Sequence, residues 1–466
     1  MEGWDPMPMP DARTMRRTLK RSAQAHLVLA AGRDPIGVLE RQHQGRIPDL
    51  VPVRVERMLR SPFAFYRGSA AVMASDLAHA PVTGVRVVAC GDAHVANLGF
   101  FASPERRLLF DLNDFDEGGV APWEWDLKRL ATSVVLAGRD AGHAEAACVA
   151  ATIETVRGYR TWLTELMGRS ALERFHVHAD VDALARLITH DSDRDVVRRA
   201  AGKARRRTSD QAFEDVTGRT SDGGLRIVER PPVTRRLSPR ATAFLEPMYE
   251  AYRATLREDV RLLLAGFRIV DAVLRVVGVG SVGTRCYLVL LKGPGDEPLF
   301  LQAKEAQPSV LVSHGGMRMV IPGAPRGAVA SEGHRVVAAQ RILQAHSDPF
   351  LGWVRGFAGA GPGRRPADFY VRQYRDMKGA IDATRLDASQ LGRYGYACGA
   401  LLARAHGQSP AARAIADYLG DSEPFDEAIA AWAGAYADVC ESDHRALREA
   451  VASGRMPVPR GVCPDR

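Results

Sequence analysis

Residues 90–117 read CGDAHVANLGFFASPERRLLFDLNDFDE, and this stretch decides both the fold class and the position of the candidate site. Two short apolar runs, residues 95–101 and 107–114, are separated by a Ser-Pro-Glu turn at residues 103–105, which predicts a β-hairpin. The hairpin would bring the later carboxylates back beside the loop that precedes it. Acidic residues near turns are also common in solvated turns, and that alternative stays open at this point.

The spacing of the polar residues in this stretch favours phosphoryl-transfer chemistry. Such enzymes place a catalytic Asp and, five residues later, a metal-binding Asn in one loop, and a further Asp follows the next strand. Asp92 and Asn97 have this spacing. We expect Asp92 to accept the proton of an acceptor hydroxyl, and Asn97 and Asp114 to hold Mg²⁺. Asp111 is the alternative to Asp114, and Asp116 is a candidate ligand for a second ion.

A second informative stretch covers residues 270–306, which read as three β-strands. A G-x-G-x-x-G turn joins the first two strands, and its candidate phosphate-binding residues are Gly278, Gly280, Ser281 and Gly283. A Rossmann fold would need a helix after this turn, but the β-like run RCYLVLL follows it. A glycine loop between antiparallel strands, with Lys304 on the next strand, is the arrangement that covers nucleotide phosphates in protein kinases. A hairpin relieved by glycine, with a surface lysine, is the alternative.

Residues 331–346 predict a helix that begins near Glu332. In a kinase-like lobe a helical Glu holds the strand lysine in place, and Glu332 is the candidate for that role. Glu305 and Gln340 are the alternatives.

The two stretches occur in the reverse of the usual kinase order, because the catalytic-loop candidate precedes the glycine loop. We therefore expect an α+β, protein-kinase-like fold of two lobes in circularly permuted order, which is permissible because chain ends lie at surfaces. The expected units are an N-terminal helical or flexible segment (1–50), a catalytic-loop lobe (51–265), a β-rich nucleotide-covering lobe (266–380) and C-terminal helices completing the first lobe (381–466). The basic residues 171–240 form an insertion, a lid or a connector.

CGDAHVAN resembles the HGDLHxxN loop of the aminoglycoside and choline kinase-like phosphotransferases, with Cys90 in place of the first His. The segment DFDEGGVAPWEWDLKRLA resembles the one that follows in those enzymes, which implies that Asp126 accepts hydrogen bonds from the loop. His94 then orders the loop, with a catalytic role as the alternative. ALLARAH, near the C-terminus, resembles the helix that normally runs into this loop, as permutation would leave it.

Almost the whole chain also resembles an uncharacterised bacterial family, the domain of unknown function numbered 2252. That resemblance is carried by SPFAFYRG, CGDAHVANLG, FDLNDFDE, PWEWDLKRLA, GVGSVGTRCYLVLL, LQAKEA and RQYRDMKG. It implies membership and no particular activity, so the function has to be inferred from the site.

Composition narrows the cellular setting and the partners. The 466 residues carry a net charge of +8 and six dispersed cysteines without a C-x-x-C pair, which argues against disulfides or structural zinc and favours the cytoplasm. The N-terminus has no apolar leader segment, and no run is long enough to span a membrane. The basic runs at residues 16–21 and 197–207 lack interleaved aromatics, so they are expected to be solvated helix faces and nucleic acid is not the expected partner.

The sequence thus predicts an ATP- and Mg²⁺-dependent phosphotransferase that acts on an unknown hydroxyl group of a small molecule or a protein. Three alternatives stay open. They are a nucleotide-binding pseudokinase, an enzyme that transfers AMP, and a metal-dependent phosphohydrolase that uses the Asp cluster alone.

Overall fold

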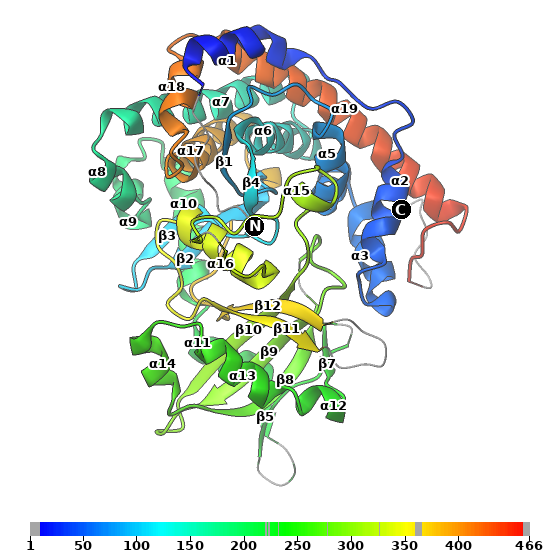
Figure 1. Ribbon diagram of the computed structural model, residues 1–466, viewed down its shortest axis with the longest axis vertical. Coiled ribbons are helices and arrows are strands. Elements are labelled where there is room, and N and C mark those ends of the chain that lie inside the picture. Colours follow the sequence, from blue (N-terminus) through cyan, green and yellow to red (C-terminus); the bar gives the residue numbers. More distant parts are fainter. Residues whose placement is uncertain are drawn as a thin grey trace.

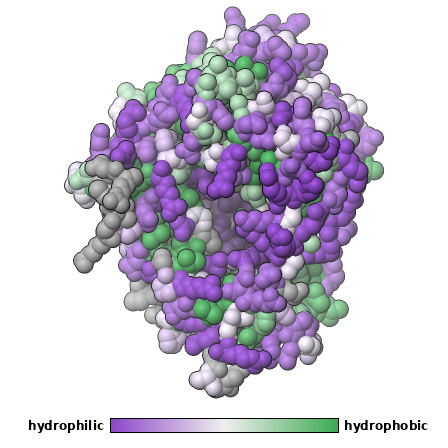
Figure 2. Space-filling view, turned by 180° about the vertical axis from the view of Figure 1, so that it is seen from behind, coloured by the Kyte–Doolittle hydropathy of each residue, from purple (hydrophilic) through white to green (hydrophobic). Residues whose placement is uncertain are grey.

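The computed structural model describes residues 10–219, 221, 224–231, 233–276, 278–325, 327–358 and 366–459. These residues form a mixed α and β structure with a helical part and a part built on a six-stranded antiparallel sheet, which lie at the upper and lower ends of Figure 1. The face in Figure 2 has a hollow near its centre, bordered mainly by hydrophilic residues. No helix among the described residues is long and apolar enough to span a membrane.

The helical part is built around long helices that pack closely. Its main members are α6 (Trp123–Asp140), α7 (Glu145–Gly168), α17 (Ala388–His406), α18 (Ala412–Leu419) and α19 (Pro424–Ala452). Glycine permits the contact between α7 and α17, because a Cβ on Gly399 would lie 2.0 Å from the Thr155 carbonyl oxygen. Small residues on α17 therefore allow it to pack closely on α7.

The predicted acidic hairpin is confirmed. β2 (Leu98–Ala102) pairs antiparallel with β3 (Leu108–Leu112), with Phe100 opposite Phe110. A second pair, β1 (Arg86–Ala89) and β4 (Gly119–Pro122), flanks it, and β4 leads directly into α6. Residues 90–97 therefore lie between β1 and β2, next to the first turn of α6.

The large sheet has the strand order β11-β12-β10-β9-β8-β7. The three predicted strands are confirmed as β8 (Arg268–Arg275), β9 (Cys286–Lys292) and β10 (Pro298–Ala306), and the others are β7 (Thr234–Arg236), β11 (Gly352–Ala358) and β12 (Pro366–Gln373). α13 (Leu245–Arg253) and α14 (Glu258–Leu264) share an apolar core with the sheet. The sheet unit therefore begins before the boundary expected at residue 266.

Residues 171–240 pack against both parts of the molecule. α9 (Val181–Leu187) and α10 (Asp191–Arg205) contact the β2–β3 hairpin, and α11 (Ser209–Val216) contacts β10. The segment also contains α8 (Ala171–His176), β5 (Thr217–Arg219) and β6 (Leu225–Ile227). The segment therefore connects the helical part to the sheet.

The N-terminal helices are α1 (Ala12–Thr18), α2 (Pro35–His43), α3 (Val51–Leu59), α4 (Pro62–Gly68) and α5 (Ala70–Leu77). The start of α4 is capped by Ser61, whose hydroxyl accepts a hydrogen bond from the Ala64 N–H at 3.2 Å, and Pro62 is the first helical residue. Residues 1–9 of the expected flexible start, and Cys463, lie outside the described residues. The five described cysteines are free thiols.

Candidate active site

A cavity of about 900 Å³ lies where three segments of the chain meet. The first is the acidic segment, residues 90–117. The second is the glycine loop, residues 278–283. The third is the arm, residues 35–68, which contains α2, α3 and α4. Segments almost two hundred residues apart in sequence thus share one cavity.

The start of the acidic segment is fixed by Asp126, as the sequence predicts. Asp126 is 1 % exposed and accepts hydrogen bonds from the backbone N–H groups of Cys90 at 2.6 Å and Gly91 at 2.9 Å. His406, in the helix that carries ALLARAH, lies 3.2 Å from the same carboxylate. Gly91 has a φ of 78°, and a Cβ there would lie 2.3 Å from the Glu117 carbonyl oxygen. Buried groups therefore hold the backbone of this loop in one conformation.

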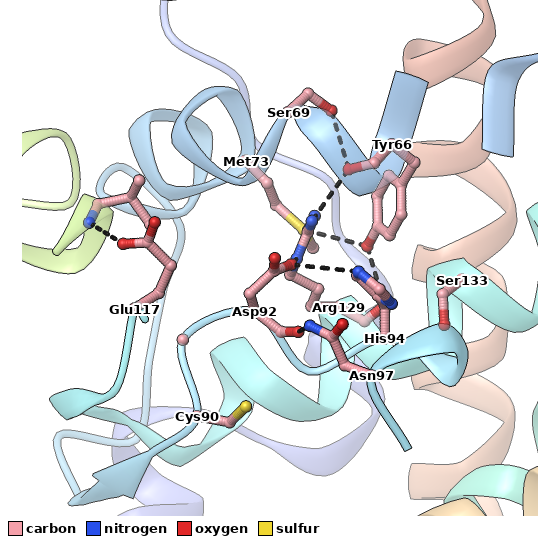
Figure 3. Close-up of polar contacts among 12 residues, drawn as sticks. Tyr66, Ser69, Met73, Cys90, Asp92, His94, Asn97, Glu117, Arg129 and Ser133 are labelled. Carbon is pink, nitrogen blue, oxygen red and sulfur yellow. Dashed lines mark hydrogen bonds and ion pairs between the residues drawn. The ribbon is translucent and has the colours of Figure 1, made fainter. Parts of the chain in front are cut away.

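Asp92 lines the cavity and is paired with Arg129. The Arg129 Nε lies 2.5 Å from the Asp92 carboxylate, and its guanidinium stacks 4.3 Å from the centre of the Tyr66 ring (Figure 3). Burial raises the pKa of Asp92 to about 6 despite the adjacent cation. The sequence prediction missed Arg129. Its signal was the helical spacing, because Arg129 lies one turn after Asp126 on the same helix.

Asn97 and His94 both lie beside Asp92, on the same side of it in Figure 3. The Asn97 Nδ2 donates to the Asp92 carbonyl oxygen at 2.8 Å, which fixes the amide plane, and the residue lines the cavity. The His94 Nε2 lies 3.9 Å from the Asp92 carboxylate, and its Nδ1 is buried without a hydrogen-bond partner. Burial, with the charge of Arg129, lowers the pKa of His94 well below its usual value, so the ring is neutral.

The three aspartates proposed for metal binding separate into two groups. Asp114 and Asp116 line the cavity. Asp111 does not line it, because it lies within β3 and its carboxylate accepts hydrogen bonds from the backbone N–H groups of Leu112 and Ala345 at 2.8 Å and 2.9 Å. Asp111 thus has a structural role in this arrangement, and Asp114 and Asp116 are the carboxylates available to a cation.

Asp116 joins the acidic segment to the sheet. Its carboxylate accepts hydrogen bonds from Lys304 Nζ at 2.6 Å, from the Tyr370 hydroxyl at 2.6 Å and from the Ser281 hydroxyl at 3.1 Å. Burial opposes ionisation of Asp116, but Lys304 and Tyr370 outweigh it and keep the pKa of this carboxyl below its usual value. Lys304 is 2 % exposed, so Asp116 is the group that links it to the cavity.

The expected pair between Lys304 and Glu332 is not formed. Glu332 does begin its helix, α16 (Glu332–Leu343), and lines the cavity, but its carboxylate binds Arg335 Nε at 2.6 Å. Arg335 also donates to the backbone carbonyl of Asp116 at 2.9 Å. The expectation was wrong because each side chain has another partner. Lys304 pairs with Asp116, and Glu332 pairs with Arg335.

The glycine loop is held from outside by the arm. The Ile47 N–H donates to the Gly283 carbonyl at 2.7 Å, Arg46 donates to the Val282 carbonyl at 2.5 Å, and Arg57 donates to the Gly278 carbonyl. A Cβ on Gly283, whose φ is 93°, would lie 2.9 Å from the Arg46 Cβ. Glycine is therefore required at this contact, which the sequence pattern alone did not indicate.

The donor set facing the cavity is of the oxygen type that Mg²⁺ prefers. Within the described ranges there is no cluster of three or more His, Cys, Asp or Glu side chains able to hold a metal ion by themselves. Mg²⁺ is commonly held by one or two carboxylates together with substrate phosphates, and Asn97, Asp114 and Asp116 fit that mode.

Comparisons with known proteins identify a family and no characterised relative. No curated protein matches the chain, and no solved structure matches it. One family model, described as an uncharacterized protein conserved in bacteria (DUF2252), matches residues 46–450, a range that includes the acidic segment, the glycine loop and most of the cavity-lining part of the arm. The chain therefore belongs to the bacterial family DUF2252.

Proposed function

We propose that this protein is an ATP- and Mg²⁺-dependent phosphotransferase that acts on a hydroxyl acceptor. The observation that carries the proposal is the convergence of Lys304 and Ser281 on the Asp116 carboxylate, at 2.6 Å and 3.1 Å. A glycine loop and carboxylates that line one cavity, with a strand lysine that reaches it through Asp116, are parts of a phosphoryl-transfer site. Their order along the chain supports a kinase-like fold in circularly permuted form.

Each part has a role in this proposal. The glycine-loop backbone and Lys304 bind the nucleotide phosphates, and Asn97 and Asp114 hold Mg²⁺, which shields the phosphate charge. Asp92 orients the acceptor hydroxyl and takes its proton as the oxygen bonds to the γ-phosphorus, while ADP leaves with the electrons of the broken bond. Arg129 fixes the Asp92 carboxylate at 2.5 Å. The pKa of Asp92, about 6, suits a base that works near neutral pH.

In this proposal, phosphate oxygens of the nucleotide would take the place of Asp116 beside the Lys304 ammonium, and the released carboxylate would face the metal together with Asp114. The Tyr370 hydroxyl, 2.6 Å from Asp116, remains to hold that side chain. Glu332 pairs with Arg335, so the proposal gives Glu332 no role beside the lysine.

The products of ATP turnover distinguish this proposal from two of the alternatives, the AMP-transferring enzyme and the pseudokinase. The full chain with ATP and Mg²⁺, and with water as the stand-in acceptor, should release ADP and phosphate, whereas an AMP-transferring enzyme would release pyrophosphate and a pseudokinase would release neither. Asp92→Asn should lower ADP release by about 10²- to 10⁴-fold. Asp438→Asn, which removes an exposed carboxylate far from the cavity in sequence, is the control. Pyrophosphate in place of ADP, or equal activity in Asp92→Asn, would contradict the proposal.

We also propose that the reaction takes place in the cytoplasm. ATP is available there, and a reducing compartment agrees with the free thiols of the five described cysteines.

A further inference from the structure

The arm contributes four arginines to the cavity wall, Arg41, Arg46, Arg54 and Arg67, and the last three are called the arm arginines below. Arg54 is fully buried and Arg46 is 7 % exposed. None of the roles proposed above uses their charges.

The arm arginines have no carboxylate partner. In the part of the chain that the structure describes, none of the three makes an ion pair, and the Nε of each is buried without a hydrogen-bond partner. Arg54 binds neutral acceptors instead, Gln42 Oε1 at 2.7 Å and the Gly68 carbonyl at 2.6 Å. A buried guanidinium without a counter-ion is costly, so this wall of the cavity is suited to an anion.

The carboxylates across the cavity do not supply that anion, because most of them have cations of their own. Four such pairs have contacts between 2.5 and 2.9 Å: Asp92 with Arg129, Asp116 with Lys304, Glu305 with Arg285, and Glu332 with Arg335. The Glu117 carboxylate accepts a hydrogen bond from the Val310 N–H at 2.6 Å. The positive charge on the arm therefore remains available to a ligand.

Arg67 is the arm arginine whose charge acts on the proposed base. Burial lowers the pKa of Arg67, and the charges of Asp92 and Asp382 oppose this. Arg67 and Asp92 line the same cavity. The Arg67 carbonyl lies 3.4 Å from the position that a Cβ would take on Gly280. Arg67 thus lies beside the glycine loop, in the cavity that Asp92 also lines.

We propose that the arm arginines form a subsite for an oxyanion group of the acceptor, separate from the place of the nucleotide phosphates. The acceptor is then a small molecule that carries a phosphate or carboxylate in addition to its hydroxyl. A cavity of about 900 Å³ covered by the arm is at the large end of the range for small-molecule sites and suits a nucleotide beside a small acceptor. This inference rests on the proposed function.

Calorimetric titration of inorganic phosphate into the full chain tests the subsite. The titration is made with and without saturating Mg²⁺ and a non-hydrolysable ATP analogue. Phosphate should bind in both states. Its affinity should fall at least tenfold in Arg67→Gln and return to within about threefold of the parent in Arg67→Lys, which keeps the charge. Arg86→Gln, which removes an exposed arginine at the start of β1, should leave the affinity unchanged.

Two results would overturn the subsite. If the bound analogue abolishes phosphate binding, the arm arginines serve the nucleotide phosphates. If Arg67→Gln binds phosphate as tightly as the parent, the arm arginines do not form a phosphate-binding subsite. A chain that binds no ATP analogue would contradict the proposed function, and the phosphate affinities of the nucleotide-free parent and Arg67→Gln would still decide whether the subsite exists.

Discussion

Residues 90–97 and the glycine loop line the same cavity but are held in different ways. Residues 90–97 are fixed from within their own part of the molecule, since Asp126 accepts the N–H groups of Cys90 and Gly91 at 2.6 and 2.9 Å. The glycine loop is held by groups from elsewhere in the chain, through Ser281 to Asp116 at 3.1 Å and through the arm. The first loop is thus a fixed scaffold, whereas the second is positioned by contacts that a ligand can replace.

The largest expected effect comes from breaking the scaffold at Asp126. Asp126→Ala leaves two buried N–H groups and His406 without their acceptor, so we expect the free energy of unfolding to fall by about 3–5 kcal/mol. Asp126→Asn keeps one carbonyl acceptor and should lose clearly less. Chemical denaturation measures both. A loss below about 1 kcal/mol in the Ala variant would show that the loop is not held through this carboxylate.

A smaller effect is expected from forcing the glycine loop away from the arm. Gly283→Ala should weaken binding of an ATP analogue by about tenfold or more, because its φ is 93° and the new Cβ meets Arg46 at 2.9 Å. Gly278→Ala is the matched control, since its φ is also positive, 64°, but no atom lies within 4 Å of the new Cβ. Equal affinities in the two variants would mean that the contact with the arm does not position the loop.

The fall in activity at acidic pH tests the role of Asp92, which belongs to the loop formed by residues 90–97. Asp92 must be ionised to accept a proton, and its pKa is about 6, so kcat/KM should fall tenfold per pH unit below about pH 6 and level off above it. Rates of ADP formation between pH 4.5 and 8 measure this fall. The residual activity of Asp92→Asn should lack it. A parent profile that stays flat down to pH 5 would remove Asp92 as the base.

The smallest effect is expected at the point where the loops meet. Ser281→Ala removes a single hydrogen bond of 3.1 Å to Asp116, worth about 0.5–1.5 kcal/mol, so the affinity for an ATP analogue should change by about tenfold or less. The stability of the chain should change little, because the loop retains its contacts with the arm. A loss of stability as large as that of Asp126→Ala would contradict the difference drawn between the two loops.

Local patterns in the sequence were sufficient to predict the hairpin and three strands of the sheet. They depend on alternation and turn residues within a few positions of one another. The role of Asp126 as acceptor for the loop was also predicted and is confirmed.

The partners across the cavity could not be predicted in the same way. Which of Asp114 and Asp116 would meet Lys304 depends on the path of the chain after β3 ends, where side chains no longer alternate in a regular way. The pairs Asp116 with Lys304 and Asp92 with Arg129 join different elements, and the arm reaches the glycine loop from more than two hundred residues away. Such contacts depend on tertiary packing, and no regular spacing of residues in the local sequence indicates them.

The central claim is that the acidic segment and the glycine loop form one nucleotide site. Calorimetric titration of a non-hydrolysable ATP analogue with Mg²⁺ into the parent chain, Lys304→Ala and Asp114→Asn tests it most directly. We expect measurable binding by the parent and at least tenfold weaker binding by both variants, one from each half of the site. Unchanged affinity in Lys304→Ala would contradict the claim, whatever the behaviour of Asp114→Asn.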